Sequence, residues 1–484
     1  MRSVVRVELR DSTLIPERSS FDPRESASVM LAVSRLNAAV KQGRVECCSL
    51  TGRRRECMLP ELISCTPSGV RYSRSTSILE SVEFTTSHYV GQACVRLPDA
   101  DEDVVIRVSP RFGKVVWMHL LAEATRVYLP ESFLSSGVGA DSSDNEWLLL
   151  LMWRSAFERA MRYASVPKAY IEQDRNLRCF RGRLDVARQI RDNLTNQSRF
   201  RCSYKPLTYD NTINRTIRCV YHILSNLRLS GSAYVSIAEH DAKLASLGVG
   251  NSVTIREIDA INYTRMTEPY RQVMALSKVL LRGYGANEVE SGGTAPAYFV
   301  DVAEIWENYL FSVMRRGLPE YMFVSPNEEG GDWLFENARS IRPDFMVYDK
   351  GGNLVAIMDA KYKRYDKIGR YSSDAHAVGR DDLYQMATYL YRFSSTERPI
   401  SGIFLSPYSG CDEGVRHMAA NGLHTMAVCN LDLFSLDEMV TTEKLELREA
   451  VRRLKSAEEL FCERLRKLLC GEKSQFSNTG GLSS

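Results

Sequence analysis

The sequence predicts a multidomain α/β protein whose character changes along the chain. Its 484 residues are too many for one hydrophobic core, so several domains are expected. We expect a β-rich N-terminal domain over residues 1–135 and a mainly helical middle domain over residues 147–285. A C-terminal domain, in which helices flank a mixed sheet, is expected over residues 297–484. This division rests on two linker-like segments and on strand-like patterning before the first linker and helical patterning after it.

The two dividing segments have the composition of linkers. Residues 131–146 are rich in Ser, Gly and Asp, and residues 283–296 contain four glycines and one proline. Neither segment shows hydrophobic periodicity, and such clusters usually connect elements rather than form them. The segments therefore separate the three expected domains.

Hydrophobic patterning predicts the elements of each domain. Clusters of β-branched residues in the N-terminal part predict strands at Val4–Leu9, Val45–Ser49 and Val104–Val108, and one helix is expected to follow at Val115–Tyr128. Apolar residues recur at helical spacing further along the chain. This spacing predicts helices over residues 147–163, 211–229, 268–282 and 443–469.

The composition, 44% hydrophobic and 25% charged, is typical of a globular protein. No apolar run approaches the roughly 18 to 20 residues that span a bilayer. Arg6, Glu8 and Arg10 interrupt the N-terminal apolar stretch, so we predict no signal peptide and a cytoplasmic location. The twelve cysteines are scattered without zinc-site spacing, and we expect them to be mostly buried small hydrophobic residues.

One segment of the middle domain is strongly basic. Residues 175–218 contain eleven Arg and Lys against three Asp, a net charge of +8 over 44 residues, with four aromatic residues among them. Guanidinium groups neutralise phosphates and rings contact bases or sugars, so this mixture suits a nucleic-acid surface. A solvated face of a mixed domain is the alternative. Candidate DNA contacts here are Arg181, Arg183 and Arg201.

A predicted β-hairpin carries the chemistry of the C-terminal domain. Phe345–Tyr348 and Leu354–Tyr362 have the patterning of strands, and residues 349–353 that of a tight turn. Side chains alternate along a strand, so Asp359 and Lys361 project from the same face. The hairpin brings Asp344, at the start of the first strand, beside them.

Two carboxylates and one ammonium at a strand end suit phosphodiester hydrolysis. Mg²⁺, or Mn²⁺ in its place, prefers oxygen ligands, and Asp344, Asp359 and the carbonyl of Ala360 supply them. The bound metal lowers the pKa of a water and offsets charge on the reacting phosphate. Lys361 orients or helps to deprotonate that water and stabilises the growing negative charge.

Two flanking helices add polar groups to this constellation. Within the helix expected over residues 301–317, Glu307 lies at the edge of the apolar stripe and is a candidate further metal ligand, with Glu304 as the alternative. The helix expected over residues 380–393 places Gln385 and Tyr389 one turn apart on one face, where an amide and a hydroxyl suit a DNA phosphate or a metal-bound water.

A simpler interpretation of the hairpin is that Asp344 caps a turn and that Asp359 and Lys361 form a surface pair. Against this, Asp359 lies in an otherwise apolar run, and burial of an unpartnered carboxylate is costly. The order of hairpin, helix and a further strand over Ile400–Leu405 favours a metal-dependent nuclease core of the PD-(D/E)XK type.

The order of these motifs also resembles the McrC family, the nuclease subunit of McrBC modification-dependent restriction systems. In the C-terminal domain the resemblance is carried by Asp344, DAKYK (359–363), DLYQ (382–385) and IFLSP (403–407). Upstream it is carried by YVGQACVRL (89–97), VIRVSPRFG (105–113), FRGRLDVARQI (180–190), RFRCSYKPLTYDNTINRTIR (199–218) and INYTRMTEPYRQVMALSKVLL (261–281). Residues 1–88 are not covered, and Pro110-Arg111 departs from the more usual Pro-Lys.

The resemblance implies activities that spacing alone does not give. The chain would cut double-stranded DNA carrying modified cytosine when assembled with a McrB-like AAA+ GTPase. Its N-terminal part would dock on that partner and stimulate GTP hydrolysis. The family's catalytic positions carry over to Asp344, Asp359, Lys361 and Gln385. Apart from the resemblance, Lys363 and Tyr389 are further candidate DNA contacts. The sequence contains no GxxxxGK[ST] phosphate loop, so nucleotide-driven motion must come from another protein.

Two other functions fit the same residues. A stand-alone DNA repair or processing nuclease close to RecB is compatible with the Gln385 and Tyr389 spacing. A catalytically inert DNA-binding adaptor of an AAA+ motor is the alternative outside the enzymes, and the intact set of two acids and a lysine argues against it. Cutting of unmodified linear DNA without any NTPase would favour the repair nuclease.

Overall fold

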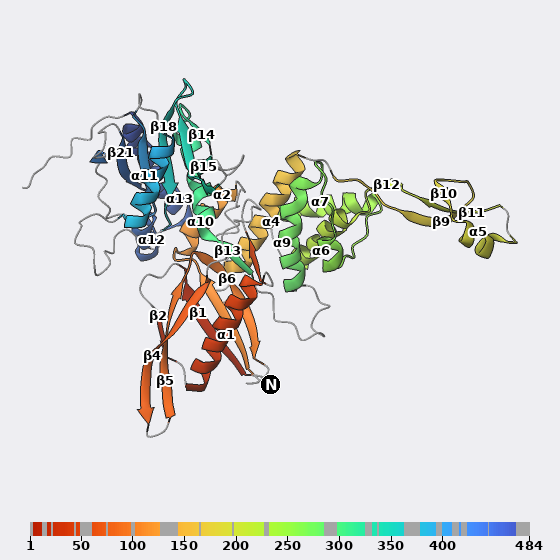
Figure 1. The fold of residues 1–484 in the computed structure, drawn as a ribbon, viewed down its shortest axis with the longest axis horizontal. Coiled ribbons are helices and arrows are strands. Elements are labelled where there is room, and N and C mark those ends of the chain that lie inside the picture. Colours follow the sequence, from red (N-terminus) through yellow and green to blue (C-terminus); the bar gives the residue numbers. More distant parts are fainter. Residues whose placement is uncertain are drawn as a thin grey trace, which may run out of the picture. The chain divides into compact units, whose positions relative to one another are not determined.

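The computed structural model describes most of the chain as a mixed α/β protein (Figure 1). The described residues are 3–11, 17–20, 23–42, 45–48, 61–73, 76–97, 102–125, 144–163, 166–195, 198–226, 232–284, 298–324, 332–335, 338–362, 378–393, 399–408, 416–417, 424–443 and 445–470. They fall into two compact units. The first unit contains residues 1–50, 55–148 and 298–484, and the second consists mainly of residues 149–297.

A five-stranded sheet forms the N-terminal part of the first unit, in the order β1-β7-β6-β13-β3. Its strands are β1 (Ser3–Arg10), β3 (Glu46–Cys48), β6 (Tyr89–Leu97), β7 (Glu102–Ser109) and β13 (Tyr298–Asp301). Buried and half-buried residues alternate along β7, as expected for a strand with one face on a core. The helix α1 (Pro23–Lys41) packs against β6 and against a smaller sheet, β2-β5-β4. That sheet contains β2 (Glu17–Ser20), β4 (Ile63–Ser73) and β5 (Thr76–Thr86).

The strand β13 shows where the structure differs from the predicted division into three domains. It begins the segment expected to form a separate C-terminal domain, yet it pairs antiparallel with β6 and parallel with β3. The N-terminal and C-terminal segments consequently share one sheet and one compact unit. Pairing between strands about 200 residues apart depends on tertiary contacts that local patterning does not encode.

A six-stranded mixed sheet forms the C-terminal part of the first unit, in the order β14-β17-β18-β19-β21-β20. Its strands are β14 (Met322–Val324), β17 (Phe345–Tyr348), β18 (Leu354–Ala360), β19 (Ser401–Ser406), β20 (Arg416–His417) and β21 (Thr425–Asn430). β15 (Asp332–Phe335) and β16 (Ala338–Ile341) form a separate hairpin. The mixed sheet flanked by helices agrees with the expectation for this part of the chain.

The helices of the first unit cover the six-stranded sheet and join it to the N-terminal sheet. α11 (Arg380–Phe393) packs on β18 and β19, where Met386 and Leu390 meet Ile357 and Phe404. α10 (Val302–Gly317) packs on β18, on α13 (Leu447–Cys470) and on α2 (Lys114–Thr125), and α12 (Leu433–Thr442) contacts α2 and α13. α11 has the bounds predicted from the sequence.

The second unit is mainly helical, as its sequence predicts. Its helices are α4 (Asp144–Tyr163), which begins in the first unit, α5 (Val186–Asn193), α6 (Thr212–Asn226), α7 (Ser232–Ser246), α8 (Ile255–Asp259), the 3-10 helix η1 (Glu268–Tyr270) and α9 (Arg271–Tyr284). Trp153, Phe157 and Tyr221 pack together in its core, and Trp153 Nε1 donates to Ser277 Oγ at 2.8 Å.

Small sheets complete the second unit. β9 (Gln173–Leu177), β10 (Arg183–Leu184) and β11 (Phe200–Tyr204) form a three-stranded antiparallel sheet beside α5. β8 (Ala169–Tyr170) pairs with β12 (Leu207–Thr208). Within this unit the three-stranded sheet and α5 lie to one side of α4, α6, α7 and α9 (Figure 1).

Several expected segments lie partly outside the described residues. Most of the two expected linkers is not described, but α4 begins at Asp144, inside the first of them. Residues 126–128 of the expected helix over Val115–Tyr128 are also not described, and α2 ends at Thr125. In the part of the chain that is described, no helix is both long and apolar enough to cross a membrane.

Candidate active site

The hairpin of β17 and β18 places Asp344 beside Asp359. Phe345 pairs with Met358 in the antiparallel hairpin. Asp344 precedes Phe345 and Asp359 follows Met358, so the two acids lie beside each other at the end of the pairing. The main-chain N–H of Ala360 donates a hydrogen bond of 2.7 Å to Asp344 Oδ2. The two acids that the sequence predicts at this position therefore lie on adjoining strands and are held together by a main-chain hydrogen bond.

Lys361 lies among three polar groups at the end of β18. Its Nζ forms an ion pair with Asp359 Oδ2 and lies 3.4 Å from Asp382 Oδ1. The same Nζ donates to Gln385 Oε1 at 2.7 Å. Asp359 is buried, with 3% of its surface exposed. The lysine is thus held over a buried carboxylate by groups from two elements, β18 and α11.

Negative charge dominates the electrostatics of this cluster. Burial, and then the carboxylates of Glu307 and Asp359, raises the pKa of Asp344 well above its usual range. Burial opposes the charge on Lys361, but Asp359, followed by Asp382 and Asp344, outweighs burial and raises the pKa of Lys361. One ammonium therefore faces several acids, an arrangement that favours the binding of a further cation.

The helix α10 contributes Glu307 to this electrostatic environment. The Asp301 side chain caps the helix by accepting from the main-chain N–H of Glu304 at 3.2 Å. Glu304 is buried, whereas Glu307 is half-buried. Of these two acids, Glu307 is the one whose charge raises the pKa of Asp344.

The helix α11 holds Gln385 through Tyr389. Gln385 Nε2 donates to the Tyr389 hydroxyl at 2.8 Å, and that hydroxyl donates to the Arg342 carbonyl at 3.1 Å. These bonds use the amide nitrogen and so turn the amide oxygen towards Lys361. Tyr389 is buried and Gln385 is exposed. Gln385 is consequently the solvent-facing member of the pair, and Tyr389 orients it.

Asp382 is a site residue to which the sequence interpretation gave no role. It lies in the first turn of α11 and is buried, and its carboxylate contacts Lys361. The DLYQ motif could have indicated this role for Asp382. Residues three apart on a helix share a face, so Asp382 is expected on the same face as Gln385.

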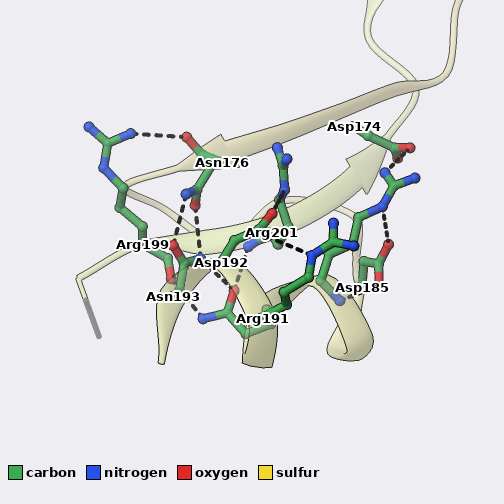
Figure 2. A network of polar contacts seen from close by, with 10 residues as sticks. Asp174, Asn176, Asp185, Arg191, Asp192, Asn193, Arg199 and Arg201 are labelled. Carbon is green, nitrogen blue, oxygen red and sulfur yellow. Dashed lines mark hydrogen bonds and ion pairs between the residues drawn. The ribbon is translucent and has the colours of Figure 1, made fainter. Parts of the chain in front are cut away.

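Of the candidate DNA contacts, Tyr389 lies at this site, where it orients Gln385, and the three arginines lie in the second unit. Lys363 is outside the described residues. Arg181 and Arg183 are exposed in the second unit, where Arg181 precedes β10 and Arg183 is its first residue. Arg201 is half-buried on β11, and its Nε contacts Asp192 Oδ2 of α5 at 2.9 Å. Figure 2 shows Arg201 within a network that joins α5 to the sheet.

The oxygen atoms of this cluster are its possible metal ligands. In the described ranges, no group of three or more His, Cys, Asp or Glu side chains is placed to hold a metal ion. Asp344, Asp359 and the Ala360 carbonyl offer two carboxylates and one further oxygen. Such a donor set would suit a hard cation such as Mg²⁺, which proteins commonly hold by one or two carboxylates, water and substrate phosphate.

Comparisons with known proteins identify the family. The chain matches a family model described as "McrBC 5-methylcytosine restriction system component" over residues 84–400, which includes Glu307, Asp344, Asp359, Lys361 and Gln385. No curated protein matches the chain.

Two solved structures from Thermococcus gammatolerans are similar to the chain. A refined half-complex of McrB AAA+ hexamers with bound McrC, from a tetradecameric assembly, contains a chain with a TM-score of 0.49 and 16% identity. The match covers 96% of this chain and 100% of that chain. A cryo-EM structure of the McrBC complex gives a TM-score of 0.33 and 16% identity, covering 65% and 88% of the two chains. The family assignment rests on the sequence match, which spans well over half of the protein. The chain belongs to the McrBC family of 5-methylcytosine restriction system components.

Proposed function

We propose that the chain is the McrC-like endonuclease subunit of a modification-dependent, type IV restriction system. It cuts double-stranded DNA carrying modified cytosine by metal-dependent phosphodiester hydrolysis in a PD-(D/E)XK-type core. The observation that carries this proposal is the approach of Asp344, Asp359 and Lys361 at the end of the hairpin. Membership of the McrBC family supports the restriction role.

Asp344, Asp359 and the Ala360 carbonyl would hold Mg²⁺ or Mn²⁺, with Glu307 as a further carboxylate. The raised pKa of Asp344 supports this fit. The neighbouring carboxylates disfavour a negative charge on Asp344, and a bound cation would offset that repulsion. When bound, the metal supplies an acidified water and offsets negative charge on the phosphate.

Lys361 acts in this proposal as a fixed positive charge. The acids around it raise its pKa, so its Nζ stays protonated at neutral pH and is suited to stabilising negative charge rather than accepting a proton. Gln385 holds the ammonium from the solvent side through its Oε1, and Tyr389 fixes the amide by accepting from its Nε2. These contacts pre-organise the lysine before DNA arrives.

DNA contact is proposed for one face of the three-stranded sheet in the second unit. Side chains alternate along β11, and Arg201 contacts α5, so Phe200 and Tyr204 lie on the face opposite to α5. The Arg181 guanidinium lies 5.5 Å from the centre of the Tyr204 ring. Arg175 pairs in register with Cys202 on this face and forms no ion pair among the described residues. We call Arg175, Arg181, Phe200 and Tyr204 the basic-aromatic face.

Assembly with a McrB-like AAA+ GTPase is the last part of the proposal. The chain has no phosphate loop of its own, and it belongs to the family of a multi-component restriction system. We propose that its N-terminal part docks on the GTPase and stimulates GTP hydrolysis, and that the motor brings DNA to the nuclease.

The experiment that tests this function is cleavage of methylated and unmethylated plasmid by the purified full-length chain. It is run with Mg²⁺ or with EDTA, and with and without the AAA+ protein and GTP. We expect cleavage of methylated plasmid that requires the metal, that is lost in Asp359→Asn, and that leaves GTPase stimulation intact in that variant. Cleavage by Asp359→Asn at the wild-type rate would refute the assignment of the site.

A second candidate is a stand-alone nuclease close to RecB. The hydrogen bond between Gln385 and Tyr389 favours it, since it fixes a glutamine beside the lysine without help from any partner. Efficient cutting of unmodified linear DNA by the chain alone would select this candidate over the restriction subunit.

A further inference from the structure

A buried arginine at the end of β7 is fixed by an acid at the end of β1. Arg111 Nε lies 3.4 and 3.3 Å from the two carboxylate oxygens of Asp11, and Nη2 lies 3.2 Å from Oδ2. The Arg111 main-chain N–H also donates to Asp11 Oδ1 at 2.6 Å. Asp11 and Arg111 are 1% and 9% exposed. Contacts to both carboxylate oxygens fix the orientation of the guanidinium plane.

The same guanidinium contacts the ends of two strands in the six-stranded sheet. Its Cζ lies 4.1 Å from the ring centre of Tyr362, and its Nη1 donates to the Tyr408 hydroxyl at 2.5 Å. Tyr362 follows β18 and Tyr408 follows β19, and both are buried. We call Asp11, Arg111, Tyr362 and Tyr408 the Arg111 cluster. It joins the ends of β1, β7, β18 and β19.

Aromatic packing surrounds the cluster on the side of α12. Phe434, at the start of α12, stacks on Tyr408 with ring centres 3.8 Å apart. Phe112 lies 4.6 Å from Phe434 and meets Tyr362 edge-on at 6.2 Å. The guanidinium lies in largely buried surroundings, with Arg111 9% exposed, where polar contacts are stronger than in water.

The cluster includes the chain neighbour of a candidate active-site residue, because Tyr362 contacts Arg111 and follows Lys361. The two neighbours make different contacts: the Tyr362 ring contacts Arg111, whereas the Lys361 ammonium contacts Asp359. The Lys361 main-chain N–H donates to the Leu405 carbonyl at 2.8 Å. The contacts of Tyr362 with Arg111 and Phe112 add to this hydrogen bond and to the side-chain contacts of Lys361 at the end of the strand.

We propose that Arg111 is a positioning residue for the candidate site, which holds Tyr362 and thereby fixes Lys361 over Asp359. The proposal rests on the nuclease function proposed above and assigns a role to a residue that does not touch the site. A buried ion pair adds little net stability compared with apolar side chains of the same volume. Its directional contacts instead set the geometry of the groups it joins, here the N-terminal sheet and the catalytic strand.

The test compares Arg111→Met and Arg111→Lys with a control that loses contacts elsewhere in the first unit. Asn37→Ala is that control, because Asn37 of α1 donates to the Ile63 carbonyl at 2.8 Å and accepts from the Leu62 N–H at 3.2 Å, away from the site. The full-length proteins are assayed on supercoiled plasmid with Mg²⁺, under conditions that support wild-type cleavage and at a temperature where thermal unfolding shows all of them folded.

For Arg111→Met we expect kcat to fall by ~10²-fold, the scale of a small misplacement of a catalytic group, while KM for DNA stays unchanged. Arg111→Lys keeps the charge but loses the planar two-oxygen contact, so its kcat should lie between wild type and Arg111→Met. Asn37→Ala should keep the wild-type kcat. An Arg111→Met protein that is folded and has the wild-type kcat would overturn the proposal.

Hydrogen exchange gives a readout that does not depend on cleavage. In Arg111→Met the amides of Lys361 and Tyr362 should exchange faster than in wild type, and in Asn37→Ala they should not. If the wild-type chain cleaves no DNA at all, the nuclease function fails and exchange alone decides the positioning role. Unchanged exchange at Lys361 and Tyr362 in Arg111→Met would then contradict that role.

Discussion

The main-chain N–H of Ala360 donates a 2.7 Å hydrogen bond to Asp344 Oδ2. This bond joins the start of one strand to the end of its neighbour and sets the first acid of the site beside the second. Asp344 and Asp359 are 15 positions apart in the sequence. The turn between the two strands brings them together, and this hydrogen bond holds them there.

The first prediction concerns the charge of Lys361. Lys361→Met should lower kcat for DNA cleavage by ~10²–10³-fold, because removal of one group that stabilises transition-state charge has effects of this size. KM should change little. Lys350→Met is the matched control, because Lys350 is exposed in the hairpin turn. Steady-state cleavage by the two variants is the measurement, and equal losses in both would contradict a catalytic role for Lys361.

The second prediction concerns Asp382, which contacts Lys361 from α11. Asp382→Asn removes a charge that helps to hold the ammonium and should lower cleavage by roughly 10–100-fold, as for the loss of a supporting partner of a metal site. Asp381→Asn is the control, because Asp381 is the exposed neighbour of Asp382. This variant should cleave as wild type does. A normal rate for Asp382→Asn would show that Lys361 is positioned without it.

The third prediction concerns the basic-aromatic face. The double variant Arg175→Ala, Arg181→Ala should bind DNA more weakly, and the slope of log affinity against log salt should decrease by about 2 if both residues contact phosphates. Arg188→Ala is the control, since Arg188 is paired with Asp174 at 2.9 Å and with Asp185 at 3.4 Å. Fluorescence anisotropy over a salt series measures both slopes. An unchanged slope in the double variant would place DNA on another surface.

The fourth prediction concerns a buried acid that joins α13 to α2 and α10. Burial would raise the pKa of Glu458, but His119, and then Arg316 and Tyr309, outweigh burial and lower it. A depressed pKa in the folded state stabilises the protein above the unfolded pKa of about 4.3, and this contribution is lost as the pH falls below it.

Thermal unfolding between neutral and acidic pH tests this linkage. Wild type should have a higher Tm than Glu458→Gln at neutral pH, and the difference should shrink as the pH falls through the folded pKa of Glu458. Glu459→Gln, one residue further along α13 and exposed, should follow the wild-type profile. A Tm difference that is independent of pH would contradict the linkage.

The sequence predicted the local parts of the site better than its long-range parts. The hairpin and α11 have clear periodicity and turn chemistry, so Asp344, Asp359, Lys361 and Gln385 could be placed on their elements, and the structure brings these four residues together. The contact of Tyr362 with Arg111 could not be predicted, because it joins segments about 250 residues apart through the meeting of two sheets.

Other differences have local causes. The helix α1 was not predicted, although its buried residues Val29, Val33, Leu36 and Val40 recur at helical spacing. The assignment of β13 to the N-terminal sheet was missed for a different reason. Its four buried residues show no alternation, and a strand buried on both faces gives no indication of its partners.

In the proposed site, Asp344 and Asp359 together hold a divalent cation at the end of the hairpin. The most direct test of this assignment is a crystal structure of the full-length protein grown with Mn²⁺, recorded so that the anomalous signal locates the metal. We expect an anomalous peak bound by the carboxylates of Asp344 and Asp359, which disappears in Asp359→Asn. A metal bound elsewhere in a protein that cleaves DNA, with both carboxylates uncoordinated, would contradict it.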